Sequence, residues 1–154
     1  MCWMTNKEKL AIPKIADEDI EVIKIIKDDL KAYYHTDYQY EMMRLNEIES
    51  KNLKVTDIGA YSVGEGFHSY NPDKIEIDLK SELGGVTVVI RKKSIWPWKQ
   101  RKLDRYPRNI LIAKAIIPKG AEYLENEKGY MVSNQIILVS TFKISQNNYV
   151  LVNN

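Results

Sequence analysis

The segment "NILIAKAIIP" (109–118), together with "SNQIILVSTFKIS" (133–145), decides the fold class. Both are short apolar runs rich in β-branched residues, a composition typical of buried strands. The first run ends at Pro118, which cannot donate to a β-ladder. The same composition recurs at "DIEVIKII" (19–26), "GGVTVVIR" (84–91) and "NNYVLVNN" (147–154). We therefore expect a mostly antiparallel sheet, with a tight turn at 146–148 joining its last two strands.

Three segments are less clear. "NPDKIEIDLKSEL" (71–83) begins with an asparagine N-cap candidate and a proline, which favours a helix. Its isoleucines also alternate as in a strand, so the alternative stays open. "YEMMRLNEIESKN" (40–52) suits a short helix or an irregular connection, and "AYYHTDYQYEM" (32–42) alternates like a half-buried strand. The expected fold class is α+β: a single β-rich domain over 1–154, mostly antiparallel, with one or two short helices.

Composition restricts the class of protein. With 44% hydrophobic and 29% charged residues in 154, the chain has the balance of an ordinary globular domain. No apolar run approaches the roughly 20 residues of a spanning helix, and charges at Lys7, Glu8 and Lys9 interrupt any secretory signal. The lone cysteine, Cys2, excludes an intrachain disulfide. We expect a cytoplasmic protein that does not contact a membrane.

Charge is unevenly distributed. Net charge is only +2, yet "RKKSIWPWKQRKLDRYPR" (91–108) holds eight of the 23 Lys and Arg residues and one acid, Asp104. That segment is therefore +7, and the remaining 15 bases and 20 acids sum to −5. Lysine and arginine attract phosphates, and indole rings offer stacking faces for bases. The alternative is a solvated loop anchored by its tryptophans.

We predict that this segment binds an anionic ligand, a nucleotide or a nucleic-acid backbone, and that the "GFHSY" stretch (66–70) contributes to the same pocket. The expected ligand-binding residues are Arg91, Lys92, Lys93, Trp96, Trp98, Arg101, Lys102, Arg105, Arg108, His68 and Tyr70.

Catalytic and metal sites are weakly indicated. His68 and Ser69 are neighbours, so on an extended chain their side chains point to opposite faces and cannot act as a base and nucleophile pair. Histidines occur only at 35 and 68, too few for a zinc site. Cys2 would become an N-terminal thiol if Met1 were removed, an arrangement known for nucleophiles. We expect no catalytic residues, no metal and no cofactor.

Several motifs resemble those of short bacterial and phage proteins: the Met-Cys start, "PKIADEDI" (13–20), "GFHSY" (66–70) and "IIPKGAEY" (116–123). That resemblance implies no particular activity, although a phage origin would suit the sequestering of a nucleotide. The C-terminal third is also similar to the closing strands of ADP-ribosyltransferase-like folds. Gln135 stands where that fold carries catalytic glutamates, and Lys24 stands in place of an arginine. These departures argue against transferase activity.

The sequence thus predicts a non-enzymatic binding protein for an anionic ligand. Two alternatives remain: an ADP-ribosyltransferase-like enzyme, degenerate or active, and a protein–protein adaptor that inserts Trp96 into a partner. A protein partner or self-association is compatible with each of them.

Overall fold

The computed structural model describes residues 3–33, 38–82, 85–93, 102–107, 109–145 and 148–153. Within these ranges the chain is nearly all β, and its one helical segment is a 3-10 turn, Glu8–Ala11. The expected α+β class is therefore wrong. The strands of the largest sheet are β2 (Lys14–Ile15), β3 (Ile20–Lys27), β4 (Leu45–Glu47), β7 (Phe67–Tyr70), β11 (Ile110–Ile117), β12 (Glu122–Glu125), β13 (Tyr130–Ser133), β14 (Gln135–Ser145) and β15 (Asn148–Asn153).

This nine-stranded sheet has the order β15-β14-β11-β3-β7-β13-β12-β2, and β4 pairs with β14 outside that path. Its centre is the ladder of β11 with β3, which runs without interruption from Ile110 opposite Lys27 to Ile117 opposite Ile20. The apolar runs 19–26, 109–118 and 133–145 form these central strands, as predicted.

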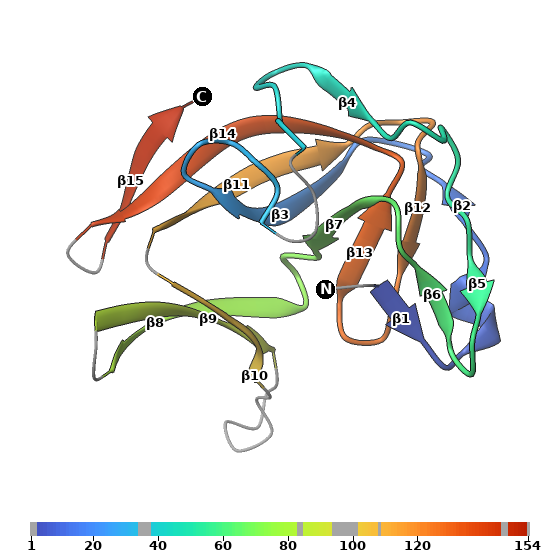
Figure 1. The fold of residues 1–154 in the computed structure, drawn as a ribbon, viewed down its shortest axis with the longest axis horizontal. Helices are drawn as coiled ribbons and strands as arrows, with labels where there is room; N and C mark the ends of the chain where they lie inside the picture. Colours follow the sequence, from blue (N-terminus) through green and yellow to red (C-terminus); the bar gives the residue numbers. More distant parts are fainter. Residues whose placement is uncertain are drawn as a thin grey trace.

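Two three-stranded sheets complete the fold (Figure 1). One has the order β10-β9-β8 and lies beneath the β14–β11–β3 part of the large sheet. Its strands are β8 (Ile75–Glu82), β9 (Gly85–Lys92) and β10 (Lys102–Tyr106). The other joins β1 (Trp3–Thr5), β6 (Tyr61–Val63) and β5 (Thr56–Asp57).

The helix favoured over 71–83 is a strand from Ile75 onward. The Asn71 side chain accepts a hydrogen bond from the Asp73 backbone N–H at 3.0 Å, which makes a turn of these residues instead of a helical first turn. Ile75 and Ile77 then alternate with exposed or half-exposed acids and pack against Val88 and Ile90. Burial of an alternating face thus outweighs the capping signal.

The segment 40–52 contains no helix; of the two alternatives, the irregular connection is the one found, with β4 between its turns. In 32–42, where a half-buried strand was expected, the described residues form isolated bridges, Ile26 with Ala32, Lys31 with Gln39 and Met42 with Leu138, and residues 34–37 lie outside the described ranges.

Both faces of the central strands are buried. Leu111 and Ala113 of β11 point into one hydrophobic cluster, with Val22, Ile26 and the β13–β14 region. Ile110 and Ile112 point into a second cluster, which also holds residues of the β8–β9–β10 sheet. No described helix is both long and apolar enough to cross a membrane.

One ladder in the large sheet is exceptionally short. Strands β3 and β7 are paired only at Ile23 and Tyr70, whereas β3 and β11 are paired over the full length of β3. From Lys24 onward, the edge of β3 that faces β7 is therefore not held by backbone hydrogen bonds to that strand. The interior of the protein opens at this split.

Substitution of either of two glycines before β7 tests the packing at the split. A Cβ on Gly66 would lie 2.4 Å from Val132 Cγ2, whereas a Cβ on Gly64 would meet nothing within 4 Å. We expect Gly66→Ala to lower the free energy of unfolding by about 1–3 kcal/mol, as overpacking does. Gly64→Ala should change it by less than about 1 kcal/mol. Urea unfolding of both variants measures this, and equal effects would contradict the described packing.

Candidate functional site

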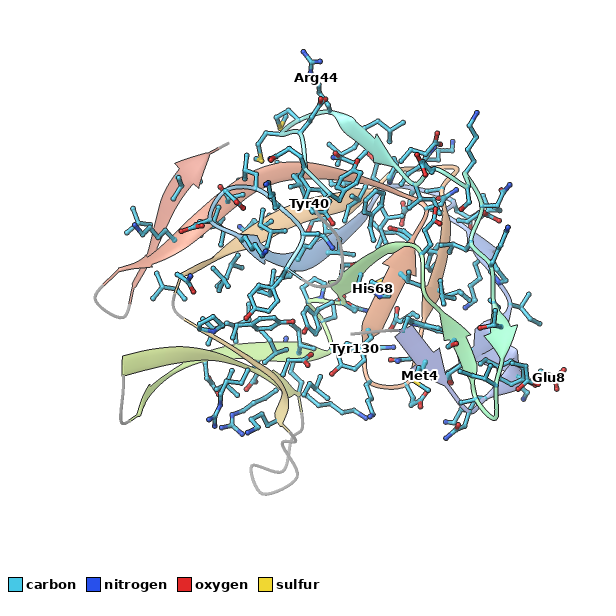
Figure 2. All side chains as sticks on the ribbon, viewed as in Figure 1. Met4, Glu8, Tyr40, Arg44, His68 and Tyr130 are labelled. Carbon is cyan, nitrogen blue, oxygen red and sulfur yellow. The ribbon has the colours of Figure 1, made fainter. Side chains whose placement is uncertain are left out.

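The split between β3 and β7 opens into a cavity of about 540 Å³. This size lies within the roughly 300–1,000 Å³ range of small-molecule sites. The lining comes from β3, β7, the connections around 32–49 and 64–66, and Tyr106 of β10. Figure 2 shows Tyr40 and His68 in the centre of the molecule, whereas Arg44 and Glu8 extend from its periphery.

Lys24 places a buried amine in this cavity. It lies in the middle of β3, on the same face as Val22 and Ile26, and only 6% of the residue is exposed. Its Nζ donates a hydrogen bond to the His68 carbonyl oxygen across the split, at 2.5 Å. Burial lowers the pKa of Lys24 from 10.5 to about 7. The amine therefore exists in both protonation states near neutral pH.

Aromatic rings form the wall beside Lys24. The Nζ of Lys24 lies 5.2 Å from the centre of the Tyr40 ring, a cation–π distance. Tyr38 packs edge-on against both Tyr40 and Phe67, with ring centres 4.9 and 5.3 Å apart. Burial raises the pKa of Tyr40, so its hydroxyl stays protonated. These rings offer flat, apolar contact area with a single charge beside it.

Ser69 adds a polar group to the same cavity. Its Oγ is buried, with no hydrogen-bond partner in the part of the chain described. Buried hydroxyls are nearly always hydrogen-bonded in folded proteins. Since Ser69 also lines the cavity, its hydroxyl is suitably placed to bond a ligand there.

Tyrosines and one carboxylate close the opposite end. Tyr70 donates a hydrogen bond to Asp104 at 2.5 Å and lies 2.6 Å from the Tyr106 hydroxyl. Tyr130 donates to the same carboxylate oxygen at 3.0 Å. Desolvation raises the pKa of Asp104, although the two hydroxyl donors partly oppose that shift. The network joins β10 to β7 and β13 and fixes the Tyr70 and Tyr106 rings that line the cavity.

Three exposed glutamates, Glu47, Glu49 and Glu65, lie among the lining residues. Glu47 accepts a hydrogen bond from Gln135 at 2.6 Å, and Glu65 accepts from the Ser50 hydroxyl at 2.9 Å. Hydrogen bonds from Ser50 lower the pKa of Glu65, which keeps it ionised. The outer part of the cavity is thus acidic, while its buried amine lies deeper.

The predicted ligand residues are divided between two places. His68 and Tyr70 line the cavity. The basic residues that the structure describes lie on the β8–β9–β10 sheet, where Arg91 forms an ion pair with Asp78 at 3.0 Å. Lys93 donates to the Pro72 carbonyl oxygen at 3.4 Å. Lys92 is half-buried, whereas Lys102 and Arg105 are exposed.

The strand register separates these basic groups from the cavity. Arg91 and Arg105 share the face of Val89, whereas Val88 and Ile90 point to the side that packs with Tyr70. The structure therefore does not bring Arg91 and Arg105 together with His68 and Tyr70. Lys92 shares the face of Ile90 but is not among the residues that line the cavity. Four predicted positions, Trp96, Trp98, Arg101 and Arg108, lie outside the described residues, as does Cys2.

His68 does not form a base and nucleophile pair with Ser69. His68 and Ser69 project to opposite faces of β7, as the alternation predicts. Among the described residues, no three His, Cys, Asp or Glu side chains gather as metal ligands. Among the groups that line the cavity are the Lys24 amine, the Ser69 hydroxyl, the His68 residue and several aromatic rings.

Sequence reasoning missed the principal residue of the site. Lys24 interrupts the apolar run "VIKII" at an inward-facing position, and that interruption is the only signal in the sequence. Tyr38 and Tyr40 come from one connection and Phe67 comes from β7, and no pattern in the sequence indicated that these segments meet. Comparison of the chain with family models, curated proteins and solved structures finds no match.

The half-buried Asp104 carboxylate predicts a pH dependence of stability. A raised pKa means that the folded state binds the Asp104 proton more tightly, so this group's contribution is present at low pH and is lost as pH rises through the raised pKa. Asp104→Asn removes the titration and keeps a polar partner for the tyrosines. Urea unfolding from pH 4 upward should show that the variant's free energy of unfolding increases relative to that of the wild type as pH rises. A difference in unfolding free energy that does not change with pH would contradict the raised pKa of Asp104.

Proposed function

We propose that the protein is a non-enzymatic binding protein for a small ligand with one anionic group and a flat body, held in the β3–β7 cavity. The observation that carries the proposal is the enclosed Lys24 amine beside the Tyr40 ring. A ligand anion would pair with the ammonium form, and its flat part would pack between Tyr38, Tyr40 and Phe67.

Charge distribution favours a small molecule over a nucleic-acid backbone. A polymer would place many phosphates along the outer surface, where Glu47, Glu49 and Glu65 would repel them. A single anionic group can instead reach the buried amine. On the β8–β9–β10 sheet, Arg91 is already paired with Asp78, which reduces its value for a second anion.

Binding without covalent chemistry also fits the side chains. The Tyr70 hydroxyl has its pKa raised by desolvation and by the neighbouring Tyr106 and Asp104, so it is a poor nucleophile. The transferase alternative would need carboxylate chemistry at the position of Gln135, whose amide instead donates to Glu47.

The charge requirement is tested with adenosine 5′-monophosphate and adenosine as probes that share one flat ring system. We expect calorimetry at pH 6.5 to show the phosphate form binding at least about tenfold more tightly, the size of one charge-assisted contact. In Lys24→Met, the two probes should bind with about equal affinity. Lys102→Ala and Arg105→Ala should preserve the wild-type affinity ratio, because these residues lie on the other face of the small sheet.

Three outcomes would count against the proposal. They are binding to neither probe, a ratio that survives Lys24→Met, and a ratio lost in the Lys102 and Arg105 variants instead. The last outcome would indicate that the anion binds to the basic segment 91–108 instead. Thermal unfolding of each variant shows whether it is folded.

Protonation of Lys24 adds a pH signature. Only the ammonium form attracts an anion, and the pKa of Lys24 in the ligand-free protein is about 7. Affinity for adenosine 5′-monophosphate should therefore fall as pH rises from 7 to 9, by up to about tenfold per unit. Lys24→Arg keeps its charge over this range and should give a nearly flat profile. Parallel profiles for the two proteins would exclude Lys24 as the anion partner.

A further inference from the structure

The buried amine of Lys24 is not held by a carboxylate. None of the ion pairs among the residues that the structure describes includes Lys24, and its Nζ donates to a neutral acceptor, the His68 carbonyl oxygen. Burial lowers its pKa to about 7, so about half of the molecules carry the neutral amine at pH 7. A neutral lysine amine in an apolar pocket has a nitrogen lone pair that can attack a carbonyl carbon.

The strand register places Ser69 opposite this amine. Ile23 of β3 is paired with Tyr70 of β7, so one step further along both antiparallel strands Lys24 lies opposite Ser69 across the split. Because side chains alternate between faces, Lys24 and Ser69 share the face that Ile23 and Tyr70 do not. Both residues line the cavity, and the buried Ser69 hydroxyl has no hydrogen-bond partner within the described part of the chain. A nucleophile and an unused hydroxyl donor therefore meet there.

The surroundings of this pair suit a carbonyl compound with a flat apolar body. Tyr38, Tyr40 and Phe67 pack edge-on or tilted against one another beside the amine and offer apolar contact to such a body. Imines are hydrolysed by water, and an apolar, partly enclosed site protects them from it. The cavity thus favours the imine over the free aldehyde and amine.

We propose that Lys24 captures an aromatic aldehyde as an imine, with the Ser69 hydroxyl donating a hydrogen bond to the carbonyl oxygen. The Nζ atom attacks the carbonyl carbon, and a C–N bond forms as the π bond of the C=O group breaks. The resulting carbinolamine loses water, which takes the former carbonyl oxygen and both hydrogens of the neutral amine, and a C=N bond remains. The step needs no oxidant or reductant, and it is reversible and stoichiometric.

This reaction adds a class of ligand to the cavity and is independent of the anion proposed above. An anion pairs with the ammonium form of Lys24, whereas an imine forms only from the neutral amine. An uncharged aldehyde therefore separates the two proposals. Adduct formation in a protein that does not distinguish adenosine 5′-monophosphate from adenosine would support the imine alone. Phosphate-dependent binding without an adduct would overturn the imine alone.

Reductive trapping with 2-naphthaldehyde and sodium cyanoborohydride at pH 7 tests the proposal, and peptide mass spectrometry locates the reduced adduct. The matched internal control is Lys27, an exposed lysine of the same strand. With the ordinary lysine pKa of about 10.4, an exposed amine is neutral in fewer than about one molecule in a thousand at pH 7. We expect Lys24 to be modified at least about tenfold faster than Lys27.

Variants separate the roles of the amine and the hydroxyl. Lys24→Met and Lys24→Arg should both lose the rapid adduct, whereas Lys27→Met should keep it. Ser69→Ala should slow adduct formation by about fivefold, the value of one neutral hydrogen bond. Ser133→Ala is its control, because the Ser133 hydroxyl is also buried without a partner among the described residues but does not line the cavity. This control should react at the wild-type rate.

The absence of an adduct on Lys24, equal modification of Lys24 and Lys27, or a rapid adduct that persists in Lys24→Met would overturn the proposal. Equal rates in Ser69→Ala and Ser133→Ala would overturn the role of the hydroxyl. The comparison of the two lysines is made within the wild-type protein, so it remains decisive if a Lys24 variant proves poorly folded.

Discussion

The hydrogen bond from Lys24 Nζ to the His68 carbonyl is the interaction on which the site depends. Strands β3 and β7 share one paired position, so their backbones do not hold each other beyond Ile23. The lysine side chain spans the opening instead. An amine in this position must find a hydrogen-bond acceptor, because burying it without one is costly. The result is a cavity whose inner end carries a titratable charge.

The rest of the fold supports that opening. The β3–β11 ladder is long and buried on both faces, so Lys24 is held on a rigid strand. At the other end, hydroxyls of Tyr70 and Tyr130 converge on Asp104 and tie the small β8–β9–β10 sheet to β7 and β13. Rigid surroundings of this kind reduce the entropy lost when a ligand is bound.

The sequence predicts the central strands well because their signal is local. These strands contain stretches such as 110–113 and 136–139 that are apolar at every position, and burial on both faces explains it. The predicted helix at 71–83 is wrong because Ile75 and Ile77 belong to a strand that pairs with β9, the next strand along the chain, and they share its buried face with Val88 and Ile90. The capping signal at Asn71 and Pro72 carries no information about that pairing.

The candidate site was predicted only in part. His68 and Tyr70 do line the cavity, but Arg91 and Arg105 lie on the other face of the small sheet, and Arg101 and Arg108 lie outside the described residues. Lys24 was visible only as a lysine within an apolar strand. Alternation over 32–42 placed Tyr38 and Tyr40 on one face but could not show that they meet Phe67, which is a long-range contact. The positive charge of 91–108 therefore led to the prediction of an anionic ligand, whereas the site proposed for that ligand is built around one buried amine, that of Lys24.

The most direct measurement is the titration of Lys24 itself, by NMR of lysine side chains labelled with ¹³C at Cε and assigned with Lys24→Arg. The account predicts one lysine with a pKa near 7 in the free protein. This pKa should rise when adenosine 5′-monophosphate is added and stay unchanged with adenosine. A Lys24 signal that titrates with the surface lysines near the ordinary value of about 10.4 would contradict the account. So would a lowered pKa that does not respond to the phosphate.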